Sequence, residues 1–133
     1  MNAKGTFDVK LGQLQPYNIM PKAKLGRMSI DKEFSGDLQA VSKGEMLSAF
    51  SNVEGSAGYV AIEEVKGFLH GKKGIFVLQH NATMAHGEQE LNIVVVHDSG
   101  TEELKGLIGK MRINIINGKH FYDFDYNIGI EWQ

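Results

Sequence analysis

Glycine residues divide this chain at short intervals, and that spacing limits the folds the chain can adopt. Gly occurs 16 times and Pro twice, and many of the stretches between glycines are roughly 8–12 residues long, as in all-β sandwiches and barrels. Helical periodicity is weak, and only the segment 101–105, followed by Gly106, reads as a short helical turn. We therefore predict eight strands, at 5–14, 24–35, 37–50, 58–70, 74–83, 89–98, 109–116 and 119–131.

Composition narrows the class of protein. A chain of 133 residues with 42% hydrophobic side chains suits a single folded domain over residues 1–133. The formal charge of −2 argues against a nucleic-acid partner, because such proteins neutralise phosphates with an excess of basic residues. The chain has no cysteine, its start lacks the apolar run of a signal peptide, and no segment is long enough for a membrane-spanning helix. We therefore expect a cytoplasmic protein with no membrane partner.

The pair Asn117-Gly118 is the clearest hairpin signal, because a type I′ turn needs positive φ at both positions. The register that follows places Ile116 opposite Lys119. It also pairs Met111 with Phe124, Ile113 with Tyr122, Ile115 with His120 and Arg112 with Asp123. Side chains alternate along a strand, so one row is predicted to point inward: Tyr122, Phe124, Tyr126, Ile128, Ile130 and Trp132.

A second hairpin is predicted around Lys72-Lys73. A two- or four-residue loop centred there pairs Leu69 with Phe76, Gly67 with Leu78 and Val65 with His80. An even loop places Glu63 and His80 on the same inward face as diagonal neighbours, whereas an odd loop would replace His80 with Gln79. The sequence leaves this parity open.

An acid and an imidazole on an apolar face are the most informative constellation in the chain. A buried carboxylate costs several kcal/mol unless it is paired or protonated. Glu63 and His80 can therefore satisfy one another as a structural pair, or transfer protons as catalytic residues. The five histidines fit no metal-ligand spacing, and no phosphate-binding loop or nucleophile elbow is present, so we expect neither a metal nor a cofactor.

Several segments resemble an uncharacterised bacterial family known as domain of unknown function 3224. They are Gly5–Lys10, Lys32–Leu38, Tyr59–Gly67, Gly74–His80, Ser99–Leu107 and Tyr122–Tyr126, which together span almost the whole chain. The resemblance implies a closed eight-stranded antiparallel β-barrel, calycin-like and similar to allene oxide cyclases. Those enzymes hold a lipid epoxide and use a buried Glu, for which Glu63 would be the analogue, but a shared fold does not carry a function. The chain departs from the family pattern at Glu64 and Lys66, and in the aliphatic stretch Leu91–Val96.

Three functions follow from such a barrel. The first is binding of a small, largely apolar molecule in the interior, since eight strands leave room for side chains or one small ligand. The ligand-binding candidates are the inward polar residues Tyr59, Glu63, His80, Tyr122 and Tyr126. The second is an isomerase or cyclase with Glu63 as general acid/base and His80 tuning it, and the sequence favours binding over catalysis.

The third function is that of a filled barrel acting through its outer surface as a structural or interaction module. Val94 and Val96 are apolar, and we predict that both face outward. A monomer rarely leaves a large apolar patch in contact with water, so these positions predict a homo-oligomer.

Overall fold

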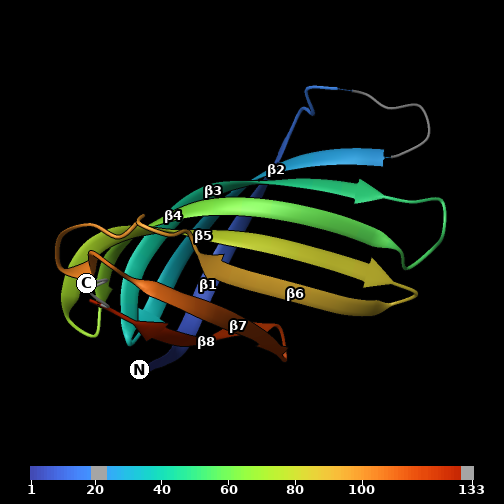
Figure 1. The fold of residues 1–133 in the computed structure, drawn as a ribbon. Helices are drawn as coiled ribbons and strands as arrows, with labels where there is room; N and C mark the ends of the chain where they lie inside the picture. Colours follow the sequence, from blue (N-terminus) through green and yellow to red (C-terminus); the bar gives the residue numbers. More distant parts are fainter. Residues whose placement is uncertain (19–23, 130–133) are drawn as a thin grey trace.

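The computed structural model describes residues 1–18 and 24–129. Its strands are β1 (Asn2–Leu14), β2 (Lys24–Gly36), β3 (Leu38–Phe50), β4 (Ala57–Leu69), β5 (Lys72–Ala85), β6 (Glu88–Val95), β7 (Ile108–Ile116) and β8 (Lys119–Asn127). Each strand pairs antiparallel with the next, and β8 pairs with β1, so the sheet closes into a barrel (Figure 1). The predicted fold class is confirmed, and the predicted helical turn is the 3₁₀ helix η1 (Glu102–Leu104).

The β7–β8 turn adopts the conformation that its sequence requires. Asn117 and Gly118 have φ angles of 51° and 77°, and Ile116 faces Lys119. The predicted register of this hairpin is therefore confirmed along its length. Tyr122, Phe124 and Tyr126 are buried as expected and Ile128 is half-buried, whereas Ile130 and Trp132 lie outside the described residues.

The β4–β5 hairpin corrects the predicted turn. Its loop is the pair His70-Gly71, with φ angles of 47° and 78°, and Leu69 faces Lys72. The register centred on Lys72-Lys73 is therefore wrong: Val65 faces Phe76, and His80 faces Ala61. The partners move by four residues, and an even shift keeps every side chain on its face of the sheet. His80 consequently points inward, and Gln79 is exposed on the outer side.

One end of the barrel is plugged by the segment between β6 and β7. Leu104 of η1 and Leu107 join the buried core, and Thr101 N–H donates to the Ile75 carbonyl at 2.9 Å. Gly74 permits this approach, because a Cβ at that position would lie 2.4 Å from the Thr101 carbonyl oxygen. We call this the closed end; the β2–β3 and β4–β5 turns also lie there, as does the N-terminus (Figure 1).

At the opposite end, which we call the open end, the inward-facing apolar side chains are only partly covered. Along β4, for example, Val65 and Ala61 are buried, whereas Tyr59 is half-buried. Leu11, which faces inward opposite Ile30, is 50% exposed. The same gradient is found on other strands, where the half-buried inward residues are Val9, Met28, Met46, Leu91 and Ile113.

The strand pairing that closes the barrel is shortest between β6 and β7. These two strands pair only at Ile93–Met111 and Val94–Lys110, whereas neighbouring strands elsewhere pair over longer stretches. Beyond these two pairs the strands diverge toward the open end (Figure 1). The barrel is therefore closed at this seam chiefly near its plugged end.

Exposed apolar side chains lie on a different part of the outer surface than the sequence predicted. Val94 and Val96 are half-buried. The outer faces of β3 and β4 instead carry exposed apolar side chains, namely Val41, Leu47, Val60, Ile62 and Phe68.

Candidate functional site

Polar side chains from four neighbouring strands meet inside the barrel, where the buried core gives way to the open end. They are Lys32 of β2, Ser42 of β3, Glu63 of β4 and His80 of β5, all of them buried. Lys32 faces Ser42 across β2 and β3. Glu63 lies diagonally from His80, since its direct partner on β5 is Leu78. We call these four residues the polar cluster.

Glu63 is the centre of the polar cluster and has no exposed surface. Its Oε2 accepts a hydrogen bond from Lys32 Nζ at 2.8 Å and another from His80 Nε2 at 2.7 Å. Burial alone would raise the pKa of Glu63, but the hydrogen bond from His80 and the charge of Lys32 outweigh it and lower that pKa from 4.5 to about 2. The carboxyl group is therefore ionised at neutral pH and accepts both hydrogen bonds.

The structure brings Glu63 and His80 together, as the sequence predicted, and adds Lys32 to them. The ammonium of Lys32 also lies 4.8 Å from the ring centroid of Phe7 and 5.7 Å from that of Phe34, which stabilises the buried cation. Lys32 interrupts an inward row that otherwise reads Met28, Ile30 and Phe34. A charge at strand period within such a row is the signal that could have identified it.

Within the described part of the chain, two oxygens of the polar cluster have no hydrogen-bond partner. Glu63 Oε1 and Ser42 Oγ are both buried and unpaired, although the other oxygen of the same carboxylate accepts two hydrogen bonds. Leaving a buried acceptor unsatisfied costs roughly 1–3 kcal/mol, and more for a charged group. Such groups in a native fold require an explanation.

The low pKa limits the chemistry that Glu63 can perform. An ionised carboxylate has no proton to donate near pH 7, which argues against the general-acid role, and a group with a pKa of about 2 is a weak general base. What the polar cluster does supply is a fixed arrangement of one anion and one cation inside an apolar barrel. Catalysis by Glu63 and His80 therefore stays a prediction that this geometry does not favour.

Tyr59 is the one predicted tyrosine on the open side of the polar cluster. It lies four residues before Glu63 on β4, faces Ala82 of β5 and is half-buried. Burial raises the pKa of its hydroxyl above the usual 10.0, so the group is neutral.

Tyr122 and Tyr126 use their hydroxyls within the closed end. The Tyr122 hydroxyl accepts from the Leu38 N–H at 2.8 Å and donates to the Ser35 carbonyl at 2.8 Å. The Tyr126 hydroxyl hydrogen-bonds to Nδ1 of His70, in the β4–β5 turn. These two predicted ligand-binding residues therefore hold the β2–β3 and β4–β5 turns, and neither is brought to Glu63.

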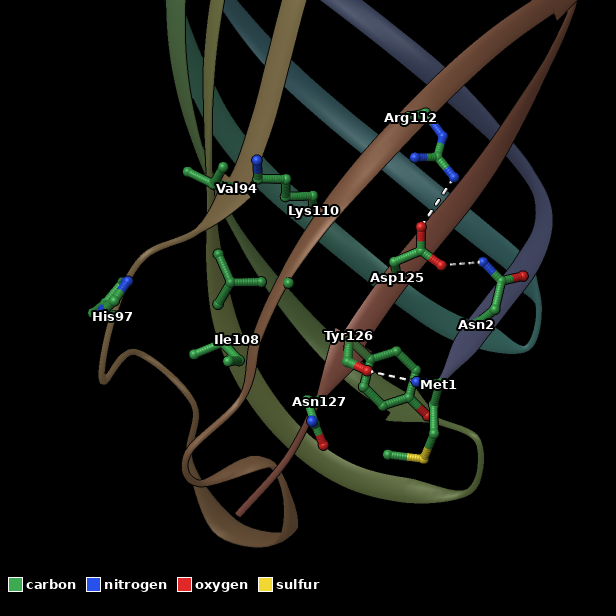
Figure 2. Close-up of a pocket in the computed structure, with 12 residues that line it drawn as sticks. Met1, Asn2, Val94, His97, Ile108, Lys110, Arg112, Asp125, Tyr126 and Asn127 are labelled. Atoms are coloured by element: carbon green, nitrogen blue, oxygen red, sulfur yellow. Dashed lines mark hydrogen bonds and ion pairs between the residues drawn. The ribbon is translucent and has the colours of Figure 1, made fainter. Parts of the chain in front are cut away.

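The outer surface has hollows that do not reach Glu63. One, of about 780 Å³, lies over the seam and the neighbouring strands, where Arg112 bonds to Asp125 and Asn2 bonds to the same carboxylate (Figure 2). Among the described residues, no three acidic or histidine side chains gather as a metal site. No helix in the described ranges is long and apolar enough to cross a membrane.

Comparison with known proteins places the chain in a family. A family model described as "Protein of unknown function (DUF3224)" matches residues 3–126. A crystal structure of a protein with unknown function from the DUF3224 family of Shewanella oneidensis MR-1 is similar, with 49% identity over 98% of each chain and a TM-score of 0.94. No curated protein matches the chain. The chain therefore belongs to the DUF3224 family, as its sequence segments indicated.

Proposed function

We propose that this protein binds a small, largely apolar molecule at the open end of its barrel. The observation that carries the proposal is the partial exposure of inward-facing apolar side chains there. Leu11 is 50% exposed, and Met28, Met46 and Ile113 are half-buried although they face the barrel interior. Covering such side chains with an apolar ligand is favourable by roughly 25 cal/mol per Å² removed from water.

The closed end supports the same proposal by contrast. Its inward side chains are packed into one buried cluster that includes Leu38, Leu69 and Leu104, so a ligand finds no space there. The open end is therefore the part of the interior where an apolar molecule can gain contacts without displacing the core.

The polar cluster lies beneath this surface, with Ala61 and Ala82 as its neighbours toward the open end. Tyr59 adds a neutral hydroxyl that can orient a bound molecule. Because Glu63 is ionised and fully buried, the geometry supports binding better than proton transfer.

A matched pair of substitutions on β3 tests the proposal. Met46 faces inward opposite Ala61, whereas Leu47 faces outward opposite Val60. Native mass spectrometry of purified protein would detect a co-purifying small molecule, and ¹³C-methyl methionine NMR with 2-octanol would report its location. We expect Met46→Trp to weaken 2-octanol binding about tenfold by filling the open end, and Leu47→Trp to leave it unchanged.

Methyl signals of Met28 and Met46 should shift on titration, and the signal of Met1, at the opposite end, should not. Shifts confined to Met1, or equal weakening by both tryptophan variants, would contradict binding at the open end.

We also propose that the protein forms a homo-oligomer through the outer faces of β3 and β4. A second copy is the favoured partner because this face carries charges of both signs beside its exposed apolar side chains. Lys43 faces Glu64 across the two strands, and Arg27 bonds to Glu45 next to Ile62. Two copies related by a two-fold axis can therefore match apolar groups and opposite charges.

Light scattering tests this proposal. It should show an oligomer for the wild type, and Val60→Lys should dissociate that oligomer. A monomeric wild type would contradict the proposal.

A further inference from the structure

The two unpaired oxygens of the polar cluster indicate what kind of head group a bound molecule carries. Glu63 Oε2 accepts hydrogen bonds from Lys32 and His80. Among residues 1–18 and 24–129, by contrast, no group donates to Glu63 Oε1, and Ser42 Oγ has no partner either. An ionised carboxylate oxygen only accepts hydrogen bonds. The partner that Oε1 requires is therefore an O–H or N–H group.

On the strand next to Glu63, the facing residue is a glycine, which brings no side chain to the carboxylate. Gly44 of β3 faces Glu63, and a Cβ built on Gly44 would lie 2.1 Å from the Ile62 carbonyl oxygen and 2.7 Å from Glu63 Cα. No side chain can therefore occupy that position without displacing the backbone. On β4 and β5 the neighbours toward the open end are only Ala61 and Ala82.

We propose that the ligand of the open end is a neutral amphiphile whose hydroxyl group donates a hydrogen bond to Glu63 Oε1, with Ser42 Oγ as a second partner. This inference rests on the proposed function, because it assigns the head group of a molecule whose apolar body lies among the open-end side chains. The methionines Met28 and Met46 form part of that surface. Glu63 has no exposed surface in the structure, so side chains must move before a head group can reach it. The methionine side chains are flexible and unbranched and can make this movement.

The charges of the polar cluster favour a neutral donor. Lys32 and Glu63 already form an ion pair, so a ligand carboxylate would bring a second anion against Oε1. A ligand ammonium would bring a second cation beside Lys32. An alcohol supplies the missing donor without adding charge, and its oxygen can also accept from the Ser42 hydroxyl.

Three eight-carbon probes separate these possibilities: 2-octanol supplies a donor, 2-octanone only an acceptor, and octanoate an anion. In the wild type we expect 2-octanol to bind about tenfold more tightly than 2-octanone, and octanoate to bind most weakly. Calorimetry measures the affinities, and methionine methyl NMR confirms that all three probes occupy the open end.

Glu63→Gln should abolish or reverse the preference for 2-octanol over 2-octanone. Lys32 Nζ and His80 Nε2 both donate, so they will hold the amide oxygen and leave the amide N–H₂ in place of Oε1. The ketone should then bind at least as tightly as the alcohol. Glu90→Gln is the control, because Glu90 is exposed on the outer side of β6, away from the proposed oligomer face, and it should keep the wild-type order.

A thermal melt of each variant establishes that it is folded. Should Glu63→Gln fail to fold, Ser42→Ala gives the same test with a smaller change, an expected loss of about threefold in the preference for alcohol over ketone.

Equal affinity for 2-octanol and 2-octanone in the wild type, with both bound at the open end, would overturn this inference and leave the proposed function standing. Tighter binding of octanoate would do the same. Absence of binding by all three probes, with no shift at Met28 or Met46, would overturn both the inference and the proposed function.

Discussion

The same strands form both ends of this barrel, but their inward side chains are buried at one end and partly exposed at the other. At the closed end, inward side chains form one buried cluster that includes Leu104 and Leu107, and tyrosine hydroxyls are hydrogen-bonded at the turns. At the open end, Leu11 and Met46 face the interior but remain in partial contact with solvent. The comparison shows that the fully buried packing is concentrated in one half of the barrel, so we expect that half to contribute more of the stability.

The polar cluster separates these two halves. Lys32 and Glu63 belong to strands on either side of β3, and they meet because β3 presents only Ser42 and Gly44 between them. A larger side chain at either position would stand in the way of the ion pair. The boundary between the halves is thus set by small residues as much as by charged ones.

The sharpest test of this division is the same substitution made at each end. Leu104 has no exposed surface, so Leu104→Ala should lower the free energy of unfolding by about 4 kcal/mol through lost contacts and a cavity. Leu11→Ala, at a side chain that is 50% exposed, should cost less than about 1 kcal/mol. Urea denaturation followed by circular dichroism measures both values. Equal losses would show that the two ends contribute equally to stability.

The stability that Glu63 contributes at the boundary should decrease in acid. A carboxyl group whose folded-state pKa is lowered stabilises the fold above its unfolded pKa, and that stability is lost as the pH falls through the folded value. For Glu63 the two values are 4.5 and about 2, and the difference corresponds to about 3 kcal/mol.

The variant Glu63→Gln should therefore be less stable than the wild type at pH 6, by about this amount, and the gap should close between pH 5 and pH 2. Urea titrations across that range measure the gap, with Glu90→Gln, at an exposed position of β6, as the control. A gap that does not change with pH would mean that Glu63 is not stabilised as an ion.

The smallest expected difference in the free energy of unfolding is between two tyrosine variants, one at each end. Tyr122→Phe removes the hydroxyl that accepts from the buried Leu38 N–H, so it should lower the free energy of unfolding by about 2 kcal/mol. Tyr59→Phe, at a half-buried hydroxyl of the open end, should change it by less than about 0.5 kcal/mol. Thermal melts of both variants suffice. A larger loss for Tyr59→Phe would show that the open end is also held by its hydroxyl groups.

Much of the fold could be predicted because turns and alternation are local properties. The β7–β8 register followed from Asn117-Gly118 alone, since few residues tolerate two successive positive φ angles. The β4–β5 register was wrong because His70, not a residue typical of such turns, adopts φ of 47° there. The predicted pairing of Glu63 with His80 survived that error, because both registers place them as diagonal neighbours on one face.

Tyr122 and Tyr126 show what the sequence of a single strand cannot predict, namely the hydrogen-bond partners of a side chain. Alternation placed both side chains inward, which is correct, but it could not locate their hydroxyl groups along the barrel. Their partners lie beside the β2–β3 turn and in the β4–β5 turn, which are distant in sequence and are brought close only when the barrel closes.

The sequence by itself determined that the Glu63 carboxylate faces the interior, because alternation fixes the side of the sheet on which a residue of one strand lies. The even loop of the β4–β5 hairpin, which the structure supplied, places the His80 imidazole on the same side. The tertiary structure alone decided that Lys32 joins them, that Glu63 is ionised, and that one of its oxygens has no partner among the residues that the structure describes. Those outcomes depend on which strands become neighbours and how small the residues between them are, and closure of the barrel settles both.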